Sequence, residues 1–172
     1  MGNEKVNEKL EFIFQNTNEW LKFAETKNGI LLGIIITTSA FLIENKTNLK
    51  NNLGVCLFIS LIISLLSFFP QNTIKFFNLV FMLKSYLSKN KEKNLLYFQD
   101  IINFTKEQYL IKILNKYFSS DEINDNYALD LTEEIIINSR ICYIKLFCFK
   151  ISLLFFIFFL INLFFSIKII IN

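Results

Sequence analysis

Three long apolar blocks, separated by charged stretches, dominate the pattern of hydrophobic and polar positions along the chain. They cover residues 29–43, 53–69 and 151–167, and the last of them carries no charged residue. Each block is slightly shorter than the roughly 20 residues that cross a bilayer, but flanking apolar residues and lysines that reach the headgroups can close the gap. Because two of the blocks lack a polar face wide enough for water, we interpret all three as transmembrane helices rather than as core helices of a soluble bundle.

The charged stretch before the first block predicts a helix that continues into the membrane without a break. Residues 1–28 alternate charged and apolar positions, and one helical pattern runs from about Val6 to Ile43. The third block is built in the same way, because the pattern that begins at about Asn126 continues through it. At 1.5 Å per residue this last helix is about 60 Å long, and roughly half of it lies outside the bilayer. Two long helices therefore connect a water-facing region to the membrane.

The remaining charged stretch, residues 70–145, predicts a helical region outside the membrane. Thr105 and Gln108 form a capping box that opens a helix ending near Phe118, and a second capping signal follows at Ser119. The stretch "NTIKFFNLVFMLKSYLSK" indicates an amphipathic helix, whereas "LLYFQDIINF" fits either a strand or a helix. No internal repeat or linker divides the chain, so we expect a single unit, 1–172, with the segments 1–28, 29–43, 53–69, 70–145 and 146–167.

The expected fold is an all-α integral membrane protein with three transmembrane helices, two of which continue as long cytoplasmic helices into a helical body. Lysine and arginine residues near the membrane ends are more frequent beside the N-terminal and middle regions than in the loop after the first block and the C-terminal tail. The positive-inside rule then places the N-terminus and the middle region in the cytoplasm and the C-terminus on the periplasmic side. The polar start "MGNEKVNEKL" indicates no cleavable signal peptide.

The composition excludes several kinds of chemistry. The chain has 172 residues, of which 53% are hydrophobic, with no His and three Cys. The absence of His removes the commonest general base and the commonest metal ligand, and the cysteines lack paired spacing. We therefore expect no enzyme activity, no catalytic residues, no metal and no bound cofactor. A net charge of +3 is too small to indicate a nucleic-acid-binding surface on its own.

Small residues form a stripe along one face of each of the first two spans. At spacings of three or four positions, these stripes consist of Gly29, Gly33, Thr37 and Ala40 in the first span and of Ser60, Ser64 and Ser67 in the second. Such stripes let helices approach closely. Two interpretations are open: packing within one subunit, or a subunit interface or weakly polar pore wall.

A lysine lies among apolar neighbours at the membrane boundary of the first helix. Lys27 should either pair with a carboxylate or extend to water. On the last helix Asp130, Glu134 and Lys145 fall on one stripe, so Asp130 and Glu134 are candidate partners of Lys27, as is Asp100. The pair is either a structural ion pair or one that breaks or forms on activation.

The lysine-rich stretch "LKSYLSKNKEKNLLYF" combines cations with aromatic rings. Nucleotides need cations for the phosphate and aromatic faces for the base, although such loops also arise from membrane topology and lipid charge. The chain has no glycine-rich phosphate loop. The candidate nucleotide-binding residues are Lys84, Tyr86, Lys89, Lys91, Lys93, Tyr97 and Arg140.

Three short patterns, in this order along the chain, resemble those of the Pycsar transmembrane effector family. The first has Trp20, Ala24, Glu25 and Lys27 before the first span. The second has Tyr97, Phe98, Asp100 and Ile101, followed by Glu107 and Tyr109. The third has Asp130, Leu131, Ile135 and Lys145 before the last span. The likeness extends over nearly the whole chain.

The resemblance implies a role in bacterial antiphage defence. In that family a partner cyclase or nucleotidyltransferase makes a nucleotide signal on infection, and the effector breaches the inner membrane. The ligand would be a cyclic mononucleotide or, as in the similar Hailong-type effectors, an oligonucleotide. We therefore expect an inner-membrane homo-oligomer around a nucleotide-gated pore. The alternatives are a membrane adaptor that recruits a partner protein and a holin-like toxin that needs no ligand.

Overall fold

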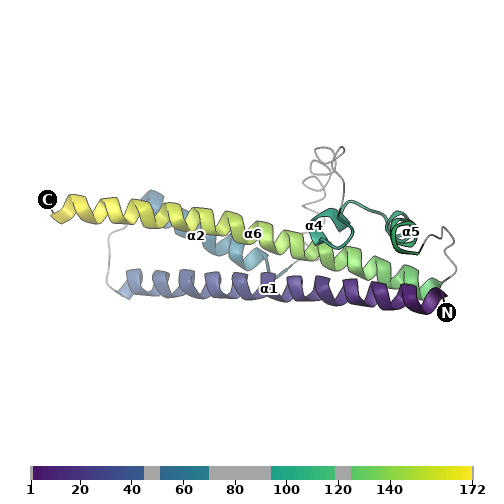
Figure 1. Cartoon of the computed structure of the whole chain (residues 1–172). Helices are drawn as coiled ribbons and strands as arrows, with labels where there is room; N and C mark the ends of the chain where they lie inside the picture. Colours follow the sequence, from purple (N-terminus) through teal and green to yellow (C-terminus); the bar gives the residue numbers. More distant parts are fainter. Residues whose placement is uncertain (1, 45–50, 70–93, 119–124, 172) are drawn as a thin grey trace. The chain divides into compact units, whose positions relative to one another are not determined.

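The structure is a computed structural model, and it describes residues 2–44, 51–69, 94–118 and 125–171 (Figure 1). Within these ranges all regular structure is helical, which confirms the all-α prediction. The helices are α1 (Gly2–Glu44), α2 (Asn51–Leu66), α4 (Phe98–Ile101), α5 (Lys106–Tyr117) and α6 (Asn126–Ile171). The amphipathic helix expected over 73–90 and the capping signal at Ser119 lie outside the described residues.

Contacts divide the chain into two compact units, where the sequence suggested one. Unit 1 comprises Met1–Phe23 and Ile74–Ile144, and unit 2 comprises Ala24–Thr73 and Lys145–Asn172. Both α1, with 43 residues, and α6, with 46, contribute to each unit without a break in the helix. The two divisions fall within a few residues of the membrane boundaries expected from the sequence.

Unit 1 packs α4 and α5 beside the N-terminal part of α1 and the N-terminal part of α6 (Figure 1). The capping box at Thr105 and Gln108 is present, and the helix it opens ends at Tyr117, as the sequence predicted. The ambiguous stretch before it forms the short helix α4 between turns, because the buried phenol of Tyr109 donates a hydrogen bond to the Leu95 carbonyl and fixes this irregular backbone. The core is apolar, with the main contributions from Leu10, Ile13, Ile101, Tyr109, Ile113 and Ile135.

Within unit 1, α1 and α6 run parallel, side by side. Three polar pairs join them in the same order along both helices: Asn7 with Asp125, Glu11 with Tyr127, and Asn18 with Asn138. Buried residues on α1 recur every three or four positions at Val6, Leu10, Ile13 and Thr17, the spacing of helices that pack along a common seam.

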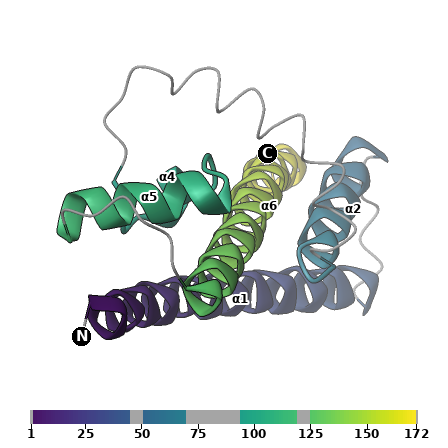
Figure 2. The ribbon, with the colours of Figure 1, turned by 90° about the vertical axis from the view of Figure 1, so that its right-hand side faces the viewer.

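Unit 2 consists of three helical segments, with α2 antiparallel to the other two. Pairs across it run in opposite order, since Ser60 contacts Ser152 and Phe68 contacts Lys145. Its core contains Leu31 and Ile35 of α1, Leu53 and Leu57 of α2, and Phe156 and Phe159 of α6, and Figure 2 shows α2 as a separate helical segment. The helix α2 covers Asn51–Leu66 and ends in a turn, slightly short of the span expected at 53–69.

Two of the described helices are long and apolar enough to cross a membrane by length and composition. These are α1 over Glu4–Glu44 and α6 over Asn126–Phe165, and the shorter apolar helix Leu53–Leu66 lies between them in the chain.

Candidate functional site

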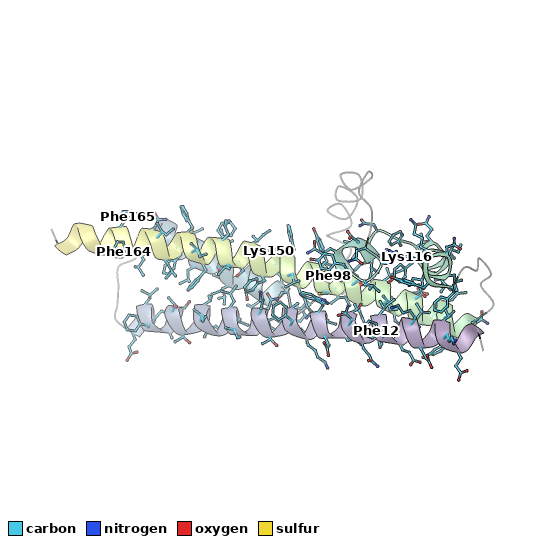
Figure 3. The ribbon with its side chains drawn as sticks, in the orientation of Figure 1. Phe12, Phe98, Lys116, Lys150, Phe164 and Phe165 are labelled. Carbon is cyan, nitrogen blue, oxygen red and sulfur yellow. The ribbon has the colours of Figure 1, made fainter. Side chains whose placement is uncertain are left out.

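Most of the exposed large hydrophobic side chains belong to unit 2 and occur on all three of its helical segments. Phe41 on α1, Phe58 on α2, and Leu154 and Phe164 on α6 are each at least 60% exposed. Phe164 and Phe165 project from the C-terminal part of α6 (Figure 3). Burying such side chains stabilises a protein by about 1.5–3 kcal/mol each, so a surface of this kind is unfavourable in water.

The interior of unit 2 is, by contrast, partly polar. Ser60 and Ser152 form a reciprocal clasp between α2 and α6, in which each hydroxyl donates to the other residue's carbonyl oxygen at 2.8 Å. Ser64 and Ser67 are also buried, and the Ser67 hydroxyl donates to the Ser64 carbonyl at 2.7 Å. The serine stripe of the second span therefore packs within one chain.

The glycine stripe of the first span lies differently. Gly29, Gly33, Thr37 and Ala40 are all exposed in the chain. A Cβ atom built at Gly29 or Gly33 would meet no other atom within 4 Å. Among the described residues, no other segment therefore packs against the two glycines.

Among the described residues of unit 2, one charged side chain is buried. The side chain of Lys145 is 6% exposed, and its Nζ lies 3.1 Å from Oε1 of Glu25, whose side chain is 50% exposed. The ring of Phe68 lies 5.7 Å from the same ammonium group. Both charged residues were among the sequence candidates, but their pairing was not predicted, because a sequence does not show how far α6 is shifted along α1.

Asn28 supports this ion pair and was missed by sequence reasoning. It is 1% exposed, and its amide donates to the Ala24 carbonyl at 2.9 Å and to the Lys145 carbonyl at 3.0 Å. Its side-chain oxygen has no hydrogen-bond partner among the described residues. An asparagine directly before an uncharged block was the available signal, since a polar side chain there needs a partner.

The predicted partners of Lys27 have other surroundings. Lys27 lies over the ring of Phe149 at 5.4 Å. Asp100 accepts a hydrogen bond from the Asn94 amide in its own loop, while Asp130 and Glu134 are exposed on α6. The ion pair that the structure describes in the boundary region joins Lys145 and Glu25.

Five of the seven candidate nucleotide-binding residues lie outside the described residues: Lys84, Tyr86, Lys89, Lys91 and Lys93. Tyr97 and Arg140 are described, and both belong to unit 1.

Tyr97 belongs to an aromatic cluster that joins the first two family-like patterns. Its ring centroid lies 6.4 Å from that of Trp20 and 4.9 Å from that of Phe98, and Trp20 lies 5.4 Å from Phe98 and 5.8 Å from Phe23. Partial burial and the Asp100 carboxylate raise the pKa of the Tyr97 phenol, so it stays neutral at physiological pH.

Arg140 lines a different hollow, of about 280 Å³, which Tyr97 does not border. Lys106 and Glu133 face each other across it at 2.8 Å, and this hydrogen bond raises the pKa of the Lys106 ammonium. Since Glu107 and Glu133 balance Lys106 and Arg140 in its lining, the hollow has no net charge to attract a phosphate.

No group of three or more His, Cys, Asp or Glu side chains that could hold a metal ion occurs in the described part of the chain. Unit 2 thus has an apolar outer surface, a partly polar interior and a boundary ion pair, and unit 1 has an aromatic cluster.

Comparison with known proteins agrees with this picture. No curated protein and no solved structure matches the chain. The sequence model of the Pycsar effector protein domain matches residues 9–172, which confirms the resemblance drawn from the three short patterns. The chain therefore belongs to the Pycsar effector protein family, whose members act in antiphage defence and respond to a cyclic nucleotide signal from a partner cyclase.

Proposed function

We propose that the chain is a three-span inner-membrane effector that assembles with copies of itself into a pore opened by a nucleotide. The observation that carries the proposal is the outer surface of unit 2, which is apolar on α1, α2 and α6, around an interior that contains a buried serine clasp. A soluble protein has the opposite arrangement, whereas lipid tails solvate apolar side chains on every outward face.

The dimensions of unit 2 support insertion as three spans. The stretch of α6 from Lys145 to Phe165 is about 30 Å long, which equals the thickness of a bilayer's hydrocarbon core. The pair of Glu25 and Lys145 lies at one end of this unit and Glu44 ends α1 at the other, so charged groups are placed where headgroups and water begin. With three crossings, the N-terminus and residues 70–145 lie on the same side, which the positive-inside rule makes the cytoplasmic one.

The glycine stripe supports assembly. Glycines on an exposed helix face offer lipid little side-chain surface to contact, but they let the backbone of a second helix approach closely. A ring of such contacts would bring the weakly polar Thr37 toward neighbouring subunits. We therefore assign the stripe to contacts between copies.

Gating requires that the ligand bind one state more tightly than the other. A near-complete switch needs about 5.5 kcal/mol of differential affinity. Because α1 and α6 each contribute residues to both units, a ligand held by unit 1 can act on unit 2 by shifting or rotating these helices.

The test is leakage of a fluorescent dye from liposomes that contain the purified protein. The liposomes are challenged separately with cyclic CMP, cyclic UMP, cyclic AMP, cyclic GMP and short DNA oligomers, with protein-free liposomes as the control. Leakage with one ligand alone is the expected result. Leakage without any ligand would indicate the holin-like toxin, and intact liposomes under every condition would indicate the adaptor.

A further inference from the structure

Unit 1 carries an open hollow of about 340 Å³ along α1, lined by Asn16, Glu19, Trp20 and Phe23. Both aromatic rings in its wall are partly exposed, Trp20 by 36% and Phe23 by 45%. The two rings stand nearly perpendicular, at 84°. A flat ring that stacks on one of them therefore meets the other with its edge, an arrangement that aromatic groups prefer.

The indole of Trp20 is held in place from within the unit. Phe98, which is 2% exposed, lies 5.4 Å from it, and Tyr97 contacts it edge-on at 6.4 Å. The amide of Asn16 donates to the Leu96 carbonyl at 3.4 Å and so attaches α1 to the segment that carries these two rings. The hollow thus has a fixed aromatic wall rather than a mobile side chain.

Two side chains of the hollow offer hydrogen-bond acceptors. Glu19 contributes an exposed carboxylate, and Asn16, whose amide nitrogen donates to the Leu96 carbonyl, contributes its side-chain oxygen. These groups repel a phosphate but suit the N–H edge of a nucleobase, as carboxylates do when they accept from the amino group of cytosine. A few acceptors beside apolar walls are typical of sites for small flat ligands.

We propose that this hollow binds the base of the activating nucleotide, with the base stacked on Trp20 and its N–H edge toward Glu19. The assignment rests on the proposed nucleotide-gated function and gives it a location. The phosphate then points out of the hollow past Glu19, and Lys22 lies three positions after Glu19 on α1.

Trp20 is the only tryptophan of the chain, so its fluorescence reports directly on this hollow. The wild-type protein in nanodiscs is titrated with each of the four cyclic mononucleotides, and with ribose 5-phosphate as a ligand without a base. A base stacked on an indole changes its emission. We expect one cyclic nucleotide to quench the emission in a saturable way while ribose 5-phosphate leaves it unchanged.

Two variants and a matched control complete the test. Glu19→Gln should weaken quenching by roughly tenfold or more, because a charged acceptor is lost. Trp20→Leu should raise the nucleotide concentration needed for liposome leakage by roughly tenfold or more. Phe12→Leu is the control, since Phe12 is an exposed aromatic residue of the same helix that does not line the hollow.

The outcomes separate this inference from the proposed function. If a nucleotide opens the pore but leaves Trp20 emission unchanged, and Trp20→Leu responds like the wild type, the site is wrong and the function stands. If a nucleotide quenches Trp20 with the expected variant effects but causes no leakage, the site stands and the pore is wrong. If no nucleotide quenches Trp20 but brominated lipids do, the ring is an anchor in the headgroup region and the inference is overturned.

Discussion

Replacement of Gly33 by leucine separates contacts between copies from folding of the single chain. A Cβ atom at Gly33 meets nothing within 4 Å, so the substitution is accommodated without a clash in the chain itself. Gly54 on α2 provides a matched control, because its Cβ position is equally open and it lies outside the stripe. Both changes should leave the isolated chain folded.

Gly33→Leu should have opposite effects on the stability of the single chain and on the association of copies. Within one helix, leucine is favoured over glycine by about 0.8 kcal/mol, so the single chain should become slightly more stable. At a close helix contact, the added side chain overpacks the interface and costs about 1–3 kcal/mol. That cost corresponds to a roughly 5–150-fold weaker association at each interface. An oligomer incurs the cost at every contact, so it should dissociate while its subunits remain folded.

The assay combines the mass of the protein in nanodiscs or detergent, measured by light scattering, with nucleotide-triggered leakage. We expect Gly33→Leu to be smaller and silent, Gly33→Ala to be intermediate, and Gly54→Leu to match the wild type. Circular dichroism checks that all three are helical. If Gly33→Leu keeps both the mass and the leakage of the wild type, the stripe faces lipid and the assignment is refuted. If Gly54→Leu fails as well, the substitutions act through folding.

Three further predictions concern stability, each measured by thermal unfolding in detergent. Ser60→Ala and Ser152→Ala should each lower the free energy of unfolding by about 1 kcal/mol. The double variant should lose less than the sum of the two, because both hydroxyls belong to the same pair of hydrogen bonds, and strictly additive losses would contradict this. Glu25→Gln should lower the free energy of unfolding by about 1–2 kcal/mol, because it leaves the buried ammonium group of Lys145 without a carboxylate. This loss is smaller than for a fully buried pair, since Glu25 is half exposed. Lys145→Met should lose less than Glu25→Gln, and an equal loss would contradict the pairing. Thr105→Ala should lower the free energy of unfolding by about 1 kcal/mol, because it removes the N-cap of α5, whereas Thr105→Ser should be as stable as the wild type. If Thr105→Ala is as stable as the wild type, the cap contributes nothing to stability.

Except for α4, the described helices could be predicted from the sequence, because their signals are local. The capping box at Thr105 and Gln108 and the start of α6 at Asn126 depend on neighbours within one turn, and both agree with the structure. The absence of proline from Gly2–Glu44 permits a helix of 43 residues, four longer at its start than the periodic pattern indicated. The family likewise followed from short patterns and their order.

The partners of individual side chains depended on the tertiary structure. The two stripes of small residues look alike in the sequence, yet Ser60 is buried against Ser152 and Gly33 is exposed. Likewise, Glu25 and Lys145 are far apart in the sequence, and only the structure shows that they pair. A helix's periodicity defines which residues share a face, but the rotation and shift of each helix against its neighbours decide what that face meets. These are set by the packing of all the helices of a unit together, so only the three-dimensional structure could reveal them.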